Sequence, residues 1–327
     1  MKDLGNLTFR LGIEVERLQD GSIFLHQRKY ILDLLATHGF TDCNPISTPQ
    51  ASSATRSSTA SSPLPYRQVV GDLQYLTTTT HPDIAYTVTF LSRHLNEPAE
   101  EHQQIAKRVL RYLKGTQDYG LLYSKSDKED FTTDLYVDAD YANDTSTRRS
   151  TSGFVLFLNG CLISWKSKLQ NIVALSTCEA EYISMSYGLL EALWLKSLLE
   201  ELQLDIKLPI NVYEDNQSTI KMAENSTLQQ RTKHIDVRHH FIRDLVKQRI
   251  IKINYCRTNS MLADILTKAP PKPMFEEHMP KLVTSIPPSN NEETSRLEGS
   301  VEERVASVRQ IFDYPNQMFG AHTRHLI

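Results

Sequence analysis

The stretch Leu135-Tyr136-Val137-Asp138-Ala139-Asp140 begins like a buried β-strand and then carries two acidic residues. Two more short apolar runs follow at 153–158 and 161–165, and Asn159-Gly160 between them is typical of a two-residue hairpin turn. A buried carboxylate is costly unless it is paired or bound to a cation. Asp138 therefore indicates a strand that carries chemistry and does not only pack.

The elements that follow these three strands alternate between helix and strand. They are expected as a helix over 176–202, a strand at 210–213, helices from 216 and around 234–247, a strand at 250–255 and a short helix over 261–267. The order β-β-β-α-β-α-α-β-α predicts an α/β fold with a mixed sheet and helices packed on it.

The chain upstream of this region has a different pattern. Apolar alternation over 7–40, turning at Asp20-Gly21, predicts a hairpin and a short helix, and three helices are expected over 66–79, 83–95 and 98–114. Between them lies a stretch of Ser, Thr, Ala and Pro that cannot bury enough apolar surface to fold. The expected organisation is a hairpin and helix over 1–46, a flexible linker over 47–65, a helical segment over 66–124, an α/β domain over 131–269 and a mostly disordered tail over 270–327.

Composition sets limits on the class of protein. The chain has 327 residues, a net charge of −3 and 40% hydrophobic residues, which suffices for one or two globular cores. No apolar run approaches the roughly 18 residues that cross a bilayer. Residues 1–10 lack the features of a secretory signal, so we expect an intracellular protein, cytoplasmic or nuclear, without a membrane partner. The four cysteines form no CxxC pair, which argues against a disulfide scaffold or a zinc finger.

Four acidic residues occupy positions where packing alone would favour apolar side chains. They are Asp138 in the first strand, Glu181 in the long helix, Asp215 at the end of the fourth strand and Asp264 in the last helix. Converging carboxylates repel one another, and divalent cations remove that repulsion. Oxygen ligands suit Mg²⁺ or Mn²⁺, and two ions roughly 4 Å apart can activate water and stabilise the leaving oxygen of a phosphodiester. The pattern predicts two-metal phosphodiester hydrolysis with water as the nucleophile.

Short motifs recur along the chain in an order that is far more specific than any one of them. They are Tyr66-Arg67-Gln68-Val69-Val70-Gly71-Asp72-Leu73-Gln74-Tyr75-Leu76, His81-Pro82-Asp83-Ile84-Ala85-Tyr86, Arg108-Val109-Leu110-Arg111-Tyr112-Leu113-Lys114-Gly115-Thr116, Tyr136 to Ala142, Ser150 to Phe154, Ser176 to Tyr182, Glu214-Asp215-Asn216, Thr232 to Arg238 and Ala263 to Lys268. With these motifs the region from about Leu11 to Met279 resembles the C-terminal part of copia-type retrotransposon Pol polyproteins, the end of the reverse transcriptase followed by ribonuclease H.

The resemblance implies a ribonuclease H-like fold, a mixed five-stranded sheet with flanking helices, preceded by a small hairpin-plus-helices segment. It implies cleavage of the RNA strand of RNA·DNA hybrids, with the four acids as ligands of two Mg²⁺ ions or of Mn²⁺. Asp138 matches the family's first-strand ligand better than Asp140 does. Glu181 is preferred to Glu179 because the small residue Ser184 follows it three positions later.

The resemblance also bears on polymerase activity. No Tyr-x-Asp-Asp tetrad occurs in the chain. We therefore expect a truncated Pol fragment that lacks the polymerase palm and has no polymerase activity, with a palm-bearing reverse transcriptase as a partner.

Basic residues cluster in sequence around the expected site and predict contacts with the hybrid backbone that tolerate any sequence and weaken with salt. They are Arg148, Arg149, Lys166, Lys168, Arg231, Lys233 and Arg238, with Tyr141 and Trp165 nearby. His234 and Asp236 are candidates for substrate positioning, although a helix-start pair is the alternative. Asp140, Glu179 and Glu214 are expected to be solvated or to support the ligands indirectly.

Two other functions remain open for the same residues. The first is a non-catalytic Pol remnant that binds hybrid or a polymerase partner through residues 66–115. The second is a related phosphotransferase, such as an integrase or an exonuclease. Metal-dependent cleavage of a hybrid distinguishes the first, and cleavage of duplex or single-stranded DNA distinguishes the second.

Overall fold

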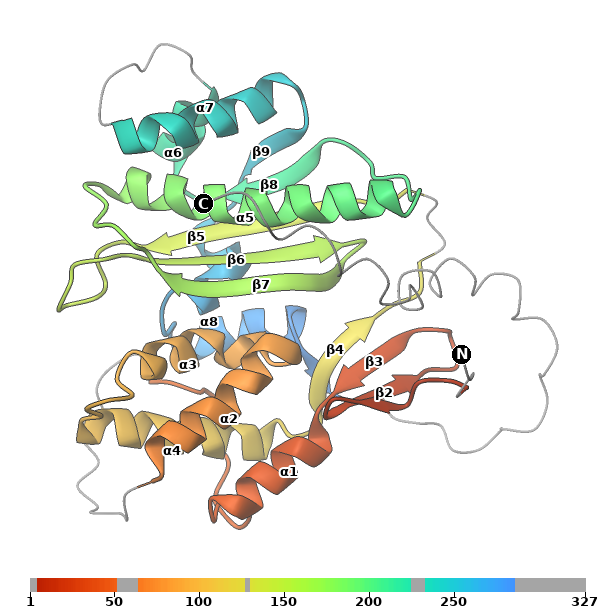
Figure 1. The fold of residues 1–327 in the computed structure, drawn as a ribbon, viewed down its shortest axis with the longest axis vertical. Coiled ribbons are helices and arrows are strands. Elements are labelled where there is room, and N and C mark those ends of the chain that lie inside the picture. Colours follow the sequence, from red (N-terminus) through yellow and green to blue (C-terminus); the bar gives the residue numbers. More distant parts are fainter. Residues whose placement is uncertain (1–4, 52–63, 127–129, 225–232, 286–327) are drawn as a thin grey trace, which may run out of the picture.

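A computed structural model describes residues 5–51, 64–126, 130–224 and 233–285 (Figure 1). The described chain forms two units, which we call upstream and downstream, each built on its own five-stranded sheet. In the part of the chain described, no helix combines the length and apolar character needed to cross a membrane.

The downstream unit contains a mixed sheet with strand order β7-β6-β5-β8-β9. Its strands are β5 (Thr133–Asp140), β6 (Thr151–Leu158), β7 (Cys161–Leu169), β8 (Ile210–Glu214) and β9 (Ile251–Tyr255). Strands β5, β6 and β7 pair antiparallel, whereas β8 is parallel to β5 and to β9. The chain therefore has the ribonuclease H-like arrangement that the resemblance implied, and the expected fold class is confirmed.

Helix α5 (Thr177–Glu201) covers one face of the mixed sheet, with α6 (Gln217–Glu224) and α7 (Lys233–Lys247) beyond it (Figure 1). Its side chains pack on Leu135, Val137 and Val212, which the alternation of β5 and β8 turns toward the helix. A Cβ at Gly188 would lie 3.0 Å from Cγ1 of Val137, so the glycine allows α5 to approach β5 closely. This contact fixes the helix that carries Glu181.

The upstream unit is an antiparallel sheet of order β1-β2-β3-β4-β10 with helices packed on it. Its elements are β1 (Phe9–Arg10), β2 (Ile13–Arg17), β3 (Ile23–His26), α1 (Arg28–Thr37), α2 (Tyr66–Thr79), the 3₁₀ helix η1 (Pro82–Ile84), α3 (Ala85–Ser92), α4 (Glu100–Gly115), β4 (Tyr119–Tyr123) and β10 (Thr284–Ser285). The expected hairpin and helices are present. Strand β4 was not predicted, because its partners β3 and β10 lie far away in the sequence.

The segment just after residue 270 contains elements that the sequence pattern did not predict. Helix α8 (Lys272–His278), the 3₁₀ helix η4 (Met279–Lys281) and β10 form at the start of the expected tail over 270–327. Phe275, Leu282 and Val283 are buried in the core of the upstream unit, and this burial offsets the entropy of ordering the segment. Residues 286–327, and residues 52–63 of the expected linker, lie outside the described ranges.

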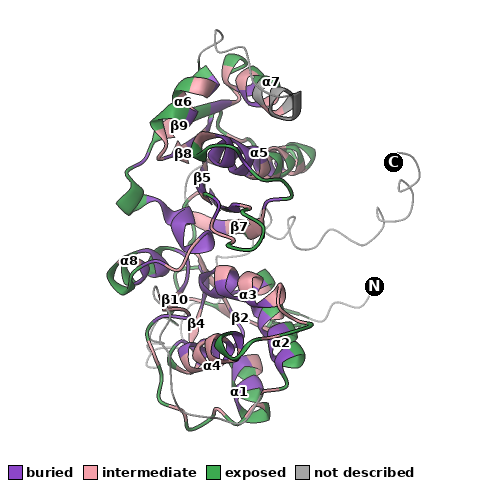
Figure 2. Cartoon of the chain, turned by 90° about the vertical axis from the view of Figure 1, so that its left-hand side faces the viewer, coloured by how far each residue is buried: buried purple, intermediate pink, exposed green. Residues whose placement is uncertain are grey.

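The two units share a hydrophobic core that is separate from the one beneath α5. Val155, Phe157 and Leu162 of the mixed sheet belong to the same buried cluster as the apolar residues of α2, α3 and α4. Nε1 of Trp165 donates a hydrogen bond to the carbonyl oxygen of Thr77 over 2.7 Å. Figure 2 shows buried segments at this contact. The mixed sheet is thus covered by α5 on one face and by the upstream unit on part of the other.

Candidate metal centre

Three acidic side chains converge from three elements of the downstream unit. Asp138 lies near the C-terminal end of β5, Asp215 directly follows β8, and Glu181 lies in the second turn of α5. Because β5 and β8 are parallel neighbours, their C-terminal ends share one edge of the sheet. One oxygen from each of the three carboxylates lies within 4.8 Å of the other two, the only such His/Cys/Asp/Glu group among the residues that the structure describes.

The start of α5 separates Glu179 from Glu181. Oγ of Ser176 accepts a hydrogen bond from the Glu179 amide over 3.2 Å, and Oε2 of Glu179 accepts one from the amide of Leu175 over 2.7 Å. The first bond satisfies an amide that the first turn of a helix leaves open, and the second ties the Glu179 side chain to the residue before the N-cap. Glu179 is therefore engaged at the helix start, whereas Glu181 lies on the turn that meets the sheet.

Asp264 occupies a neighbouring but distinct position. It lies in the 3₁₀ helix η3 (Leu262–Leu266), is fully buried, and its Oδ1 accepts a hydrogen bond from Nζ of Lys268 over 2.9 Å. Asp264 is not among the three residues whose carboxylate oxygens lie within 4.8 Å of one another. Burial, followed by the charge of Asp138, raises the pKa of Asp264 to about 8. The structure thus brings Asp264 beside Asp138, and Lys268 holds one of its oxygens.

Burial and mutual repulsion govern the electrostatics of the cluster. Burial raises the pKa of Glu181 well above its usual value, and the charges of Glu214 and Asp138 add to the shift. Burial also raises the pKa of Asp215, and the charge of Asp138 adds to it. Anionic carboxylates are therefore unfavourable here until a cation balances them.

The donor set fits a divalent cation. Oε2 of Glu181, Oε2 of Glu214 and Oδ2 of Asp264 are buried oxygens without a hydrogen-bond partner among the described residues. Buried polar atoms of this kind normally have partners. Hard carboxylate oxygens are the ligands that Mg²⁺ and Mn²⁺ prefer, so the residues present fit such an ion.

Glu214 is a member of the cluster that the sequence analysis undervalued. It was expected to be solvated or to support the ligands indirectly, and solvation is wrong because Glu214 is fully buried. Its Oε1 accepts a hydrogen bond from the amide of Asn216 over 3.0 Å, and burial raises its pKa well above the usual value. The alternation of side chains along β8 could have revealed this position, since Glu214 lies on the same face of the strand as the buried residues Ile210 and Val212.

Lys268 is a second residue that the sequence analysis missed. Burial alone would lower its pKa, but the charges of Asp138 and Asp264 outweigh burial and raise it. Lys268 therefore stays an ammonium beside the acids. The i, i+4 spacing from Asp264 was the available signal.

The predicted basic residues that the structure describes differ in exposure and in the sheet face that they occupy. Arg148 is exposed in the loop after β5, Arg149 is half-buried, and Arg238 is half-buried in α7. Lys166 and Lys168 flank Ser167, which pairs with Gly153, the partner of Asp138. Because side chains alternate along a strand, the two lysines lie on the sheet face opposite Asp138. Arg231 and the side chains of Lys233, His234 and Asp236 lie outside the described residues.

The two aromatic residues named with them differ. Tyr141 is 39% exposed, so its ring remains accessible. Trp165 packs against the shared core and donates to the Thr77 carbonyl, so its role is in joining the units. We therefore do not include Trp165 among the residues proposed to contact nucleic acid.

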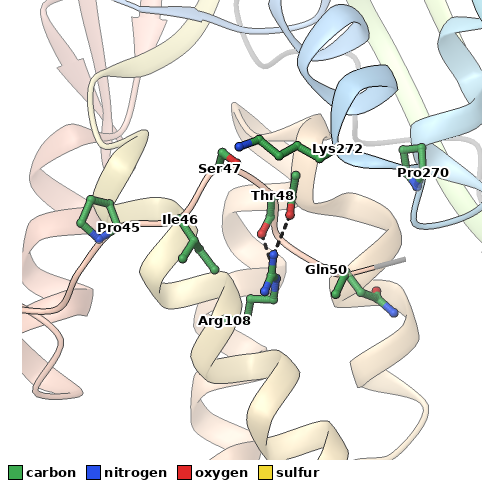
Figure 3. Close-up of a pocket in the computed structure, with 9 residues that line it drawn as sticks. Pro45, Ile46, Ser47, Thr48, Gln50, Arg108, Pro270 and Lys272 are labelled. Carbon is green, nitrogen blue, oxygen red and sulfur yellow. Dashed lines mark hydrogen bonds between the residues drawn. The ribbon is translucent and has the colours of Figure 1, made fainter. Parts of the chain in front are cut away.

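A shallow pocket lies apart from the acids, between residues 45–51, α4 and the start of α8 (Figure 3). Its Arg108 donates from Nε to the carbonyl oxygen of Thr48 over 3.1 Å and from Nη2 to Oγ1 of Thr48 over 2.7 Å. No acidic residue lines this pocket. The hydrogen bonds of Arg108 anchor the segment before residue 52. The pocket is not part of the metal centre.

Comparison with known proteins finds similar sequences in plant transposons. No protein-family profile matches it. The retrovirus-related Pol polyprotein from transposon RE1 of Arabidopsis thaliana is 39% identical over 294 residues, covering 88% of this chain and 20% of that protein. The one from transposon TNT 1-94 of Nicotiana tabacum is 40% identical over 287 residues, covering 84% and 21%. An uncharacterized mitochondrial protein of A. thaliana is 42% identical over 197 residues, covering 59% of this chain and 80% of that protein.

Solved structures are more distant. The N-terminal RNase H domain of rv2228c from Mycobacterium tuberculosis is 11% identical, with a TM-score of 0.31 over 45% of this chain and 96% of that chain. The foamy viral protease-reverse transcriptase in complex with RNA/DNA hybrid is 11% identical, with a TM-score of 0.39 over 87% of this chain and 32% of that chain. The fold assignment therefore rests on the strand order and pairing directions given above.

Proposed function

The chain belongs to the copia-type retrovirus-related Pol polyproteins of transposons, and from this premise we propose that it hydrolyses the RNA strand of RNA·DNA hybrids with divalent cations. It spans about a fifth of the length of the Pol relatives from RE1 and TNT 1-94, so the proposal concerns this part of Pol alone. The observation that carries it is the convergence of Asp138, Glu181 and Asp215 within 4.8 Å on a ribonuclease H-like sheet.

The acids have complementary roles in this proposal. Asp138 converges with Glu181 and Asp215. The Thr267 hydroxyl contacts both Oδ2 of Asp138 and the main-chain oxygen of Asp264. Asp138 would be shared by two cations, one held with Glu181 and Asp215 and the other with Asp264. Mg²⁺ or Mn²⁺, when bound, supplies activation of water and stabilisation of the leaving oxygen. No side chain acts as the nucleophile.

Burial of the site contributes to its chemistry. Asp138 and Glu181 are 3% and 6% exposed, so little water competes for their oxygens. Electrostatic interactions are stronger in such a site than in water. The rigid elements β5, β8 and α5 hold the oxygens near one another before any ion arrives, which lowers the reorganisation needed for catalysis.

The hybrid would be held through its backbone. Arg148 and Arg149, in the loop that follows the Asp138 strand, are the described basic residues that we propose for phosphate contacts. Such contacts do not read bases, and contacts to the 2′-hydroxyl distinguish the RNA strand from DNA. Binding should weaken as salt is added.

Cleavage of a labelled RNA strand within an RNA·DNA hybrid tests the proposal. We expect cleavage with Mg²⁺ or Mn²⁺, none with a chelator, and none by Asp215→Asn. Duplex DNA and single strands serve as comparison substrates and should remain intact. A parent chain that binds the hybrid without cutting it would favour the non-catalytic Pol remnant, and cutting of duplex DNA would favour a different phosphotransferase.

A further inference from the structure

The hydroxyl of Thr267 contacts the acid at the centre of the cluster. Oγ1 of Thr267 donates a hydrogen bond to Oδ2 of Asp138, although 129 residues separate the two. Thr267 is fully buried and Asp138 is 3% exposed. The same hydroxyl lies 3.1 Å from the main-chain oxygen of Asp264. Thr267 thus joins the strand that carries one acid to the segment that carries another.

Gly153 makes room for this contact. It is the register partner of Asp138 in the β5–β6 pairing. A Cβ at Gly153 would lie 2.7 Å from Cγ2 of Thr267 and 2.9 Å from Cβ of Leu266, closer than packed atoms allow. The end of η3 can therefore lie directly on β6 only because residue 153 has no side chain. The methyl of Thr267 packs there while its hydroxyl reaches the neighbouring strand.

Further polar contacts fix both partners in place. Nδ2 of Asn143 donates to the carbonyl oxygen of Thr267 over 3.2 Å, and Oγ1 of Thr151 donates to Oδ1 of Asn143 over 3.0 Å. On the other side, Oγ of Ser184 donates to the main-chain oxygen of Asp138 over 2.7 Å. The backbones of Thr267 and Asp138 are held independently of each other, so the hydroxyl–carboxylate bond has a defined geometry.

We propose that Thr267 is a positioning residue, whose hydroxyl sets the rotation of the Asp138 carboxylate so that its remaining lone pairs face the cations. The terminal torsion of an aspartate is broad, so a single donor can select one orientation. Hydrogen-bond partners of metal-binding carboxylates typically change metal affinity or activity by about 10–100-fold when they are removed. This inference rests on the proposed function, because it concerns the same cation site.

Two substitutions separate the hydroxyl from the methyl. Thr267→Val keeps the shape beside Gly153 and removes the donor, whereas Thr267→Ser keeps the donor and removes the methyl. Calorimetric titration with Mn²⁺, without nucleic acid, should show affinity at least about tenfold weaker for Thr267→Val and near that of the parent for Thr267→Ser. In hybrid cleavage, Thr267→Val should lower kcat and leave KM nearly unchanged.

Each other outcome is informative. Parent-like Mn²⁺ affinity in Thr267→Val overturns the inference, and so does equal weakening in Thr267→Ser, which would assign the effect to packing. Cation-free Tm values of both variants show whether the fold is intact, and Thr267→Ala repeats the comparison if valine prevents folding. Weakened Mn²⁺ binding in Thr267→Val supports positioning even if no protein cuts hybrid, whereas a parent that binds no Mn²⁺ overturns both proposals.

Discussion

Nζ of Lys268 lies 2.9 Å from Oδ1 of Asp264, a carboxylate that is fully buried one helical turn earlier in the chain. The contact places a resident positive charge beside one acid of the cluster, at a point where a divalent cation would also bind. In the absence of divalent cations Lys268 therefore offsets the negative charge of Asp138 and, above about pH 8, that of Asp264 as well.

Lys268→Gln should destabilise the cation-free protein by about 1–2 kcal/mol, because it removes a charge-assisted hydrogen bond whose ammonium is partly exposed. Saturating Mn²⁺ should recover most of the loss, because it replaces the missing positive charge. Thermal unfolding with and without Mn²⁺ measures both values. Lys272→Gln, which removes an exposed 3.5 Å pair with Glu276, should change little. Equal destabilisation of Lys268→Gln in both buffers would contradict the compensating role.

Substitutions at Glu181 and at Glu179 test which glutamate of α5 belongs to the metal centre. Glu181→Gln should abolish hybrid cleavage and greatly reduce the Tm gain on adding Mn²⁺, because a convergent oxygen ligand is replaced by an amide. Glu179→Gln should keep both properties and lose about 0.5–1 kcal/mol of stability, because its carboxylate only accepts the Leu175 amide at the helix start. If Glu179→Gln were instead the inactive variant, the assignment of the helix ligand would be wrong.

Local sequence signals predicted most elements of the fold. The turn at Asn159-Gly160, the apolar runs and the helical spacing each act over a few residues, and the structure has the corresponding elements. Strand β4 and helix α8 were missed, since their stability comes from distant partners such as β3, β10 and the shared core. Packing between residues that are far apart in the sequence leaves little signal in a window of a few residues.

The candidate site, like the fold, could be predicted from sequence only where the signal is local. Acids that interrupt apolar elements were visible as anomalies, so Asp138, Glu181 and Asp215 could be named from sequence. Thr267 could not, because a threonine at the end of a helix is unremarkable until Gly153 brings it to Asp138. Supporting contacts depend on the three-dimensional register, which no local motif specifies.

The shared core predicts how the units depend on each other. A fragment of residues 131–269, the domain expected from sequence, would expose Val155, Phe157 and Leu162, which are at most 6% exposed in the full chain. We expect this fragment to lack a cooperative thermal transition or to aggregate, because such an apolar face is unfavourable in water. A fragment of residues 5–285, which keeps both sheets and the shared core, should unfold cooperatively. Differential scanning calorimetry compares them, and a stable 131–269 fragment would show that the downstream unit folds alone.

Acid should weaken the contact between the units through Asp144. Burial raises the pKa of Asp144, but hydrogen bonds from Ser146 and Thr147 and the charge of Arg93 outweigh it and lower the pKa from 3.8 to about 2. Arg93, from the upstream unit, pairs with Asp144 over 2.6 Å. Because the folded pKa is lower than the unfolded one, the stabilisation is complete above about pH 4 and is lost as pH falls toward 2.

Asp144→Asn removes this dependence. At neutral pH it should cost about 1 kcal/mol, a value reduced for solvent screening of a surface pair. Urea unfolding across the acid range should show the difference between parent and variant shrinking below about pH 4. A difference that stays constant down to pH 2 would mean that the charge of Asp144 contributes nothing to joining the units.

Gly153→Ala tests the close approach of η3 to β6. The added methyl would lie 2.7 Å from Cγ2 of Thr267 and 3.1 Å from the main-chain oxygen of Ala263, so η3 must move away from the strand. Overpacking of this kind costs about 1–3 kcal/mol, and the movement should also withdraw the Thr267 hydroxyl from Asp138. We therefore expect lower cation-free stability together with weaker Mn²⁺ binding. Gly71→Ala is the matched control, since a Cβ there meets nothing within 4 Å and alanine favours a helix by up to about 1 kcal/mol. Loss of stability in Gly153→Ala with unchanged Mn²⁺ affinity would show that the cation site does not depend on where η3 lies.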